Sequence, residues 1–480
     1  MTDISSAELP PAPGAEAMPA VRSGAPALYR AIWRWHFYAG LFTVPFLVAL
    51  AVSGMMILWI GFLDGRDGEY SLSVPAETET VAVSRQVAAA IEALPGSSFV
   101  EYVSPRSETS PALVRVDDDG EARMVAVDPY SGAVLESWVR RAGWYDWADD
   151  FHGSLLLGDL GDRLLEIAAG FGLVLVATGV YLWWPRGKAP KSDAFVPKLS
   201  ARGRSLYKSL HRVVGFWTAG ILVLFLLTGM TWTGIWGAKI TQAWSTFPAE
   251  KWDAVPQSET THAHLNHGGP KEVPWTLEQT PMPASGSEAG VTGVPAGTAV
   301  DVDSVTALAR DLGIADHGRF HVSAPSGENG VWTIAQDSMS ADSHEPTADR
   351  TVHVDQFTGR ILADVAFADY SLAGKTMAVG TAFHMGLMGL WNVVLNTLFC
   401  LSIVLLCVTG VVMWWLRRPK GSFRLAAPSV PNDVPLVKGV AFIALTLAVV
   451  FPLMGLTLIA VLAFDPLVAS RLPALKRLYG

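Results

Sequence analysis

The chain has 480 residues, of which 50% are hydrophobic, with 18 tryptophans and a formal net charge of -9. The net charge averages acidic and basic stretches of the chain and by itself says nothing about nucleic acid, and no nucleic-acid partner is expected. Five apolar runs without Asp, Glu, Lys or Arg argue against a water-soluble globular protein, because one core could not bury them all. These runs cover residues 35–59, 167–184, 213–236, 390–415 and 440–464.

Each run is about as long as the ~18 to 20 residues that cross a bilayer, and tryptophans stand at most of their ends, as is typical of membrane interfaces. The sequence therefore predicts an integral membrane protein with an α-helical bundle of five transmembrane helices in contact with lipid. The segments 186–212 and 417–438 are rich in Lys and Arg, whereas 64–159 and 239–375 carry an excess of acids. The positive-inside rule then predicts a cytoplasmic N-terminus and large periplasmic or extracellular loops, which in a bacterium means the inner membrane.

The expected order along the chain alternates membrane segments with outer modules. Residues 1–28 are too polar and proline-rich to fold and are expected to be a disordered cytoplasmic tail, and the first apolar run lacks a cleavage site and is expected to be retained. The remaining segments are a first span (29–62), a first outer module (63–150), a Phe-His element with the second span (151–185), a basic cytoplasmic loop (186–205), a third span (206–238), a loop with the second outer module (239–370), a Phe-His element with the fourth span (371–416), a cytoplasmic loop (417–437), a fifth span (438–465) and a C-terminal tail (466–480).

Both outer modules are predicted to be small α+β units. Periodicity indicates a helix over 81–94 and strands over 99–104, 112–117, 122–127 and 133–139 in the first module. The second module repeats this order, with a helix over 304–312 and strands over 319–324, 331–336, 350–355 and 360–365. The hairpin sequence at 127–135 reappears at 354–362. In the fifth span, Pro452 and Gly455 predict a kink.

The membrane segments are repeated as well. Residues 36–55 align with 211–230 without a gap, and Phe-His precedes both the second and the fourth span. Those two spans also end alike, with Thr-Gly-Val and then Trp-Trp. We therefore interpret the chain as a tandem repeat of one unit, and the two copies should share an orientation and pack as a pseudo-twofold pair.

Four histidines belong to the repeat, and they are the candidate functional residues. The predicted topology puts His36 and His211 near the cytoplasmic face, and His152 and His384 near the outer face. Symmetry should bring each pair together. Two imidazoles on facing helices are typical axial ligands of a b-type haem, so we predict two bis-histidine haem sites.

Glycines accompany these histidines on the same helices. Gly40 and Gly215 follow His36 and His211 by one turn, where a missing side chain leaves room for a porphyrin. Gly54 and Gly229 lie five turns past the same histidines and should relieve crowding near the outer pair.

Charged neighbours of the inner pair point to propionate groups. Arg34 and Arg212 stand next to the inner histidines and are candidates to receive haem propionates. No flavin or nicotinamide motif occurs. A separate electron donor, either a quinol or a cytoplasmic carrier, should therefore reduce the inner site.

Taken together, these motifs resemble the PepSY-associated transmembrane family, the iron-regulated membrane proteins that include ferric-siderophore reductases of the bacterial inner membrane. The resemblance rests on the two Asp-x-x-Ser/Thr-Gly hairpins, the twin Phe-His elements, the Thr-Gly-Val to Trp-Trp endings and the segments 273–278, 369–370 and 451–455. It implies two haem b groups ligated by His36, His152, His211 and His384, and periplasmic PepSY modules. It also implies electron transfer to a ferric siderophore or another metal chelate. Our own hypothesis is that this chelate is held between the two modules.

Two functions of other classes remain open at this point. The first is a non-redox PepSY binding or regulatory membrane protein, in which the histidines only pack. The second is a haem or metal transporter, since parallel repeats also occur in transporters. The apolar spans contain no acidic residue at mid-membrane, which argues against transport.

The remaining histidines and the cysteines give weaker signals. His262, His264 and His267 lie close together on an outer loop and could hold a borderline metal, although chance histidines on a polar loop are the simpler interpretation. The other outer histidines are interpreted as surface residues: His317, His321, His344 and His353. Cys400 and Cys407 are interpreted as small apolar residues of the fourth span.

Overall fold

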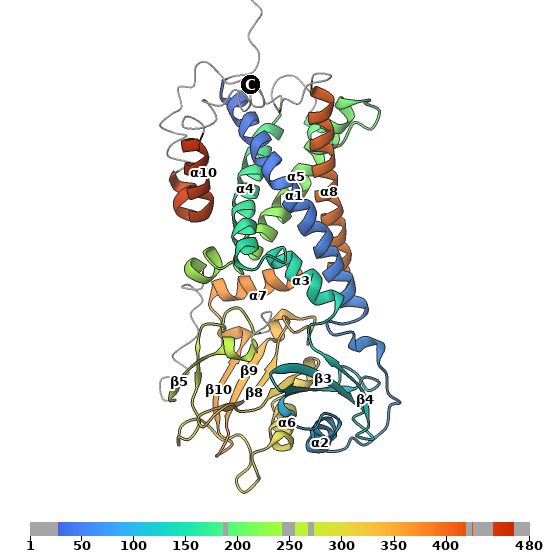
Figure 1. The fold of residues 1–480 in the computed structure, drawn as a ribbon, viewed down its shortest axis with the longest axis vertical. Helices are drawn as coiled ribbons and strands as arrows, with labels where there is room; N and C mark the ends of the chain where they lie inside the picture. Colours follow the sequence, from blue (N-terminus) through green and yellow to red (C-terminus); the bar gives the residue numbers. More distant parts are fainter. Residues whose placement is uncertain are drawn as a thin grey trace, which may run out of the picture.

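The computed structural model describes residues 27–185, 191–241, 255–266, 273–418, 425 and 445–464. It has two parts, a bundle of long helices and a β-sheet domain at one end of that bundle (Figure 1). We call the end of the bundle that meets the sheet the sheet-side end, and the opposite end the distal end.

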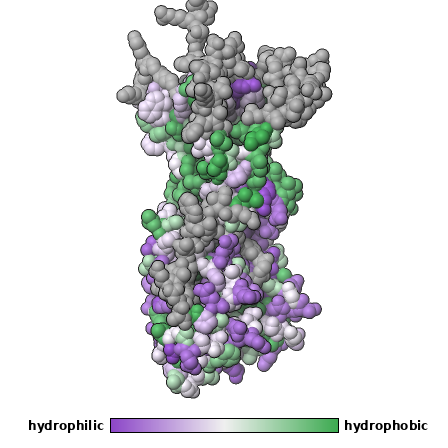
Figure 2. All heavy atoms as spheres, turned by 90° about the vertical axis from the view of Figure 1, so that its left-hand side faces the viewer, coloured by the Kyte–Doolittle hydropathy of each residue, from purple (hydrophilic) through white to green (hydrophobic). Residues whose placement is uncertain are grey.

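Four of the described helices are long and apolar enough to cross a membrane. The shortest has 25 residues, about 37 Å at 1.5 Å per residue, which exceeds the ~30 Å hydrocarbon core of a bilayer. Hydrophobic side chains gather over these helices, whereas hydrophilic ones prevail over the sheet domain (Figure 2). The four helices are α1 (Ala27–Leu63), α4 (Asp159–Trp183), α5 (Arg204–Met230) and α8 (Leu390–Arg417).

The four helices pack as a closed bundle. Helix α1 contacts α4 and α8, and α5 contacts the same two helices. Equivalent helices of the two sequence copies therefore face each other across the bundle, and each copy supplies half of its wall. This is the arrangement that symmetry predicted for the two pairs of histidines.

Two shorter helices lie between the bundle and the sheet, α3 (Trp144–Ser154) and α7 (Leu372–Met385) (Figure 1). The hydroxyl of Ser371 accepts a hydrogen bond from the N–H of Gly374 and caps the start of α7. Gly386 ends the helix with φ of 77°, and a Cβ at this position would lie 2.3 Å from Leu58 Cδ2. Only glycine fits there, so the turn directly after His384 is fixed against α1.

The described residues contain only part of the predicted fifth span. Helix α10 (Pro452–Phe464) begins after a break at Phe451, the residue before the proline that predicted a kink. It packs on α4, where a Cβ at Gly170 would meet Met454 at 3.0 Å. Residues 440–444 lie outside the described residues, so a complete fifth span stays a prediction.

The sheet domain is one antiparallel sheet of eight strands in the order β10-β9-β8-β7-β1-β2-β3-β4. Most predicted strands agree with it within one or two residues, and β8 and β9 agree at both ends. A separate two-stranded sheet pairs β5 (Gln257–Thr261) with β6 (Pro281–Pro283). The strands of the large sheet are β1 (Ser98–Val103), β2 (Ala112–Asp118), β3 (Glu121–Val127), β4 (Val134–Val139), β7 (His321–Ser323), β8 (Val331–Gln336), β9 (Arg350–Asp355) and β10 (Ile361–Ala366).

The two predicted modules are joined edge to edge in this sheet. Strands β1 and β7 pair directly, with Tyr102 opposite Val322. Helices α2 (Val83–Ala93) and α6 (Val302–Asp311) contact each other and share one hydrophobic core with strands of both modules. Backbone pairing and core side chains therefore fill the junction of the two modules, where the chelate was expected.

Buried charges reinforce the junction of the modules. Arg319 donates to Asp342 at 3.0 Å and to Glu69 at 3.3 Å, so it ties the second module to the segment that follows α1. His321 lies between Asp342, at 2.8 Å, and Glu101, at 3.4 Å. These carboxylates raise the pKa of His321 to about 10 against the opposing effect of burial. The two modules therefore form one continuous domain at the sheet-side end of the bundle.

Candidate functional site

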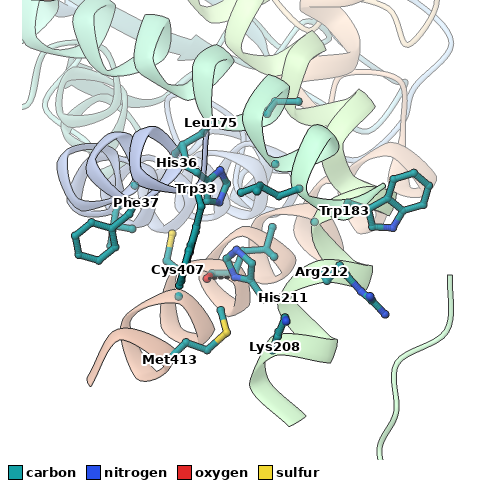
Figure 3. Close-up of a pocket in the computed structure, with 18 of the residues that line it drawn as sticks. Trp33, His36, Phe37, Leu175, Trp183, Lys208, His211, Arg212, Cys407 and Met413 are labelled. Carbon is teal, nitrogen blue, oxygen red and sulfur yellow. Dashed lines mark hydrogen bonds between the residues drawn. The ribbon is translucent and has the colours of Figure 1, made fainter. Parts of the chain in front are cut away.

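The distal end of the bundle holds the first histidine pair. His36 on α1 and His211 on α5 have ring centroids 6.2 Å apart, with their planes at 88°. They border a cavity of about 540 Å³ that is lined mostly by apolar residues of all four bundle helices (Figure 3). This volume lies within the range of ~300 to 1,000 Å³ that is usual for cofactor pockets.

The sheet-side end holds the second pair. His152 on α3 and His384 on α7 have ring centroids 6.4 Å apart, with their planes at 82°. The ring of Phe225 on α5 stacks on His384 at 4.2 Å. The separation and the angle of the two rings thus nearly repeat those of the distal pair, although the histidines come from different helices.

A hydroxyl group on a neighbouring helix contacts the Nδ1 atom of each histidine. Each of these residues is Ser or Thr, and each is followed by Gly. The four Nδ1–Oγ contacts are His36 to Thr178 at 3.0 Å, His152 to Ser53 at 2.9 Å, His211 to Thr409 at 3.1 Å and His384 to Thr228 at 2.7 Å. Every Nδ1 is therefore engaged by a hydroxyl group of another helix.

The same contacts set the distance between the pairs. Helix α1 carries His36 and also Ser53, which holds His152. The two positions are separated by 17 residues in the sequence, about 26 Å along a helix. His211 and Thr228 have the same spacing on α5. The two histidine pairs therefore lie at opposite ends of a bundle that is long enough to span a bilayer.

The geometry of each pair fits two axial ligands of one metal. A metal bound in line between two imidazole nitrogens, at about 2.0 to 2.1 Å from each, holds the ring centres about 6 Å apart. The separations of 6.2 and 6.4 Å match this value. Among the described residues, no hydrogen bond or ion pair uses the Nε2 atom of any of the four histidines.

The distal cavity also has the lining that a porphyrin needs. Gly40 and Gly215 border it, as predicted, and a Cβ at either position would only touch a leucine, at 3.7 Å or 3.5 Å. Trp33, Trp183 and Trp414 add flat aromatic surface. Because the lining is mostly apolar and the two imidazoles border it, the cavity could hold a large flat cofactor.

Cations gather at the distal mouth of this cavity. Arg212 lines it as predicted, and the side chains of Arg204, Lys208 and Arg417 line it too. Figure 3 shows Lys208 and Arg212 on the same helix as His211. Arg34, the other predicted cation, is not among the lining residues, and its guanidinium lies 4.9 Å from the centre of the Tyr38 ring. Lys208 is thus a candidate that the sequence analysis missed.

Two of the three loop histidines lie within the described residues, and the metal site considered for them stays a prediction. His262 is fully buried and its Nε2 lies 2.9 Å from Nε2 of His353, whereas His264 is exposed. His267 lies outside the described residues. Within the described ranges, no group of three His, Cys, Asp or Glu side chains could hold a metal ion.

One of the histidines interpreted as surface residues is fully buried, and a second is largely covered. His353 has no exposed surface, and the side chain of His321 is 12% exposed. The interpretation was wrong because the strands that carry them are covered on both faces. His317 and His344 are exposed, and Cys400 and Cys407 are buried among apolar residues of the bundle.

The hydroxyl groups that hold the histidines were also missed. Ser53 and Thr228 occupy equivalent positions in the two sequence copies, and so do Thr178 and Thr409. The repetition of Ser/Thr-Gly at two equivalent pairs of positions could have indicated this role. However, Ser/Thr-Gly is also common in ordinary helix packing. The glycines contact the imidazoles themselves, since a Cβ at Gly54 would lie 3.3 Å from His152 Cε1.

The comparison with protein families gives one match. The model of the PepSY-associated TM region matches residues 33–417, which include all four paired histidines and both sheet modules. A search of curated proteins finds no match.

Proposed function

The chain belongs to the PepSY-associated transmembrane family, and from that premise we propose that it is a di-haem b electron-transfer protein that reduces a ferric chelate outside the bacterial inner membrane. One observation carries the proposal. Two pairs of imidazoles, 6.2 and 6.4 Å apart between ring centres, stand at opposite ends of one membrane bundle. A regulatory protein in which these histidines only pack would not need the same pairing twice.

His36 and His211 would hold one haem, and His152 with His384 would hold the other. Bound haem would supply one-electron chemistry, and two such sites at the two faces of the bilayer would connect a donor on one side with an acceptor on the other. Lys208 and Arg212 would bind carboxylate groups at the mouth of the distal cavity. The apolar walls exclude water from the imidazoles, which keeps them neutral and available as ligands.

The direction of transfer follows from charge. The loops at the distal end are rich in Lys and Arg, which supports a cytoplasmic location for the donor, a quinol or a soluble carrier. The sheet domain would then face the periplasm. Since β1 and β7 pair directly at the junction of the modules, we assign the chelate to the surface around α3 and α7, the helices that carry His152 and His384.

The test is a single-turnover reduction. Full-length protein in detergent is reduced with dithionite, freed of excess reductant and mixed without oxygen with a ferric trihydroxamate or with ferric citrate. We expect haem oxidation and ferrous iron, trapped by a ferrous-specific chelator, in a ratio of one iron per electron. His384→Ala should abolish the fast phase of haem oxidation by the chelate, whereas His317→Ala, at an exposed position, should leave that phase unchanged.

Two results would contradict the proposal. One is a reduced protein that stays reduced with every ferric chelate, although oxygen or ferricyanide oxidises it. The other is a purified protein that contains no haem. The first result would leave the haem assignment standing and reject a ferric chelate as the substrate. The second result would reject both.

A further inference from the structure

The four Ser/Thr hydroxyls have defined hydrogen-bonding roles. Thr228 Oγ1 lies 2.8 Å from the carbonyl of Leu224, one turn earlier in α5. The other three make the same backward contact at 2.6 to 2.8 Å: Ser53 to Ala49, Thr178 to Val174 and Thr409 to Leu405. A hydroxyl has one hydrogen, and a carbonyl can only accept, so that hydrogen is committed to the helix backbone.

The histidine must therefore be the donor in each Nδ1–hydroxyl contact. An imidazole that donates from Nδ1 and is neutral has its lone pair on Nε2. For His211 a second contact gives the same answer, because Nδ1 lies 3.1 Å from the carbonyl of Leu406, which cannot donate. All four rings are thus fixed in the tautomer whose Nε2 can bind a metal.

The glycine after each hydroxyl fixes the position of the ring. A Cβ would lie 3.2 Å from His36 Cε1 at Gly179 and 3.3 Å from His152 Cε1 at Gly54. At Gly410 and Gly229 the distances to His211 and His384 Cε1 are 3.5 and 3.6 Å. The hydroxyl and the glycine together form a shallow seat on one helix for the edge of a ring that comes from another helix.

We propose that Ser53, Thr178, Thr228 and Thr409, each with the glycine that follows it, are positioning residues that lock the paired histidines in the Nδ1–H tautomer and aim each Nε2 at its partner. This inference deepens the proposed function and rests on it for its consequence. Acceptors on the far nitrogen raise the basicity of a ligating imidazole, and their loss typically weakens metal binding about 10- to 100-fold. A more basic imidazole stabilises ferric over ferrous iron, so losing the acceptor should raise the reduction potential.

The four histidines differ in how many groups contact their Nδ1 atoms, so we expect the four hydroxyl groups to differ in importance. The contact between His384 Nδ1 and Thr228 is 2.7 Å, and no other hydrogen bond of this ring is found among the described residues. His211 Nδ1 contacts both Thr409 and the Leu406 carbonyl. Removing the hydroxyl of Thr228 should therefore affect its haem more than removing that of Thr409.

The experiment compares Thr228→Val with Thr228→Ser, Thr409→Val and a matched control, all in full-length protein. Thr43→Val is the control, because Thr43 is equally buried and its hydroxyl contacts only the carbonyl of Ala39, at 2.9 Å. Redox titration and haem retention are measured for each. Thr228→Val should raise one of the two potentials and release one haem about 10- to 100-fold faster. Thr228→Ser should keep the wild-type potential and the wild-type rate of haem release. Thr409→Val should change both quantities less than Thr228→Val does, and Thr43→Val should change neither.

A second readout does not need haem. Protein from haem-deficient cells is labelled with nitrogen-15 in histidine, and ring nitrogen shifts report the tautomer. The wild type should show Nδ1–H at the four paired histidines, and His384 should lose this preference in Thr228→Val. Nε2–H tautomers in the wild type, or equal potentials in Thr228→Val and the control, would overturn the proposal. Correct tautomers in a protein that never binds haem would support the lock and reject the proposed function.

Discussion

The buried histidine pair of the sheet domain makes the stability of that domain depend on pH. His262 and His353 are fully buried, and their Nε2 atoms are 2.9 Å apart. His262 Nδ1 faces the carbonyl of Thr280 at 2.8 Å, so it is the donor there, and its Nε2 can accept from His353. Burial lowers the pKa of His262 to about 4, and burial with the neighbouring imidazole lowers the pKa of His353.

The sign of the pH effect follows from linkage. In the unfolded chain the imidazole has a pKa of ~6.5 and therefore binds a proton more readily than in the folded domain. The stabilisation is complete above pH ~6.5 and is lost as the pH falls towards the folded value of about 4. Acidification from pH 7 to 4.5 should then cost about 2 to 3 kcal/mol through His262 alone, which is roughly a 100-fold loss of protection against hydrogen exchange.

Hydrogen exchange of β8 and β9 measures this effect in the full-length protein. Protection at pH 7 and 4.5, corrected for intrinsic exchange rates, is compared between the wild type and His262→Gln, which cannot become charged. Because other titrating groups are common to both proteins, the difference between them isolates the histidine pair. His317→Gln serves as the control at an exposed position. Equal losses of protection in the wild type and His262→Gln would refute the reasoning.

Three further predictions address the junction and the histidine pairs. Tyr102→Ala should lower the free energy of unfolding of the sheet domain by about 3 to 5 kcal/mol, because this 1% exposed side chain lies in the core shared by both modules. Denaturation followed by near-UV circular dichroism measures this loss. A loss of less than about 1 kcal/mol would contradict the shared core. Gly179→Ala should disturb the electron paramagnetic resonance spectrum of the distal site more than Gly410→Ala, because the new Cβ would lie 3.2 Å rather than 3.5 Å from an imidazole carbon. Asn396→Leu should speed release of haem from the sheet-side site, because this buried amide donates to the carbonyls of Phe383 and His384; a pulse of apomyoglobin as haem acceptor measures the rate, and an unchanged rate would exclude this role.

Much of the fold could be predicted from patterns in the sequence. Residues 331–336 and 350–355 alternate in the manner of strands and coincide with β8 and β9. The pairing of His36 with His211 could be expected because equivalent residues of two copies meet near a pseudo-twofold axis. The first signal lies within a few consecutive residues, and the second lies in the repetition of the whole unit.

Other contacts between distant segments could not be predicted from the sequence. The pairing of β1 with β7 joins residues more than 200 positions apart, and edge strands look alike in sequence whether or not another strand covers them. His353 was interpreted as a surface residue of the second outer module, whereas β9 is buried on both faces. Thr228 looked like a helix-packing residue, since the backward bond to its own helix is usual for threonine.

The central claim is that the two histidine pairs hold two haems. The most direct measurement is the haem content and visible spectrum of detergent-purified protein from haem-sufficient cells, before and after dithionite. We expect two b-type haems per chain with the spectrum of two imidazole ligands, and one haem per chain in either His211→Ala or His384→Ala. A folded protein without haem, or one whose haem content is unchanged in both variants, would contradict it.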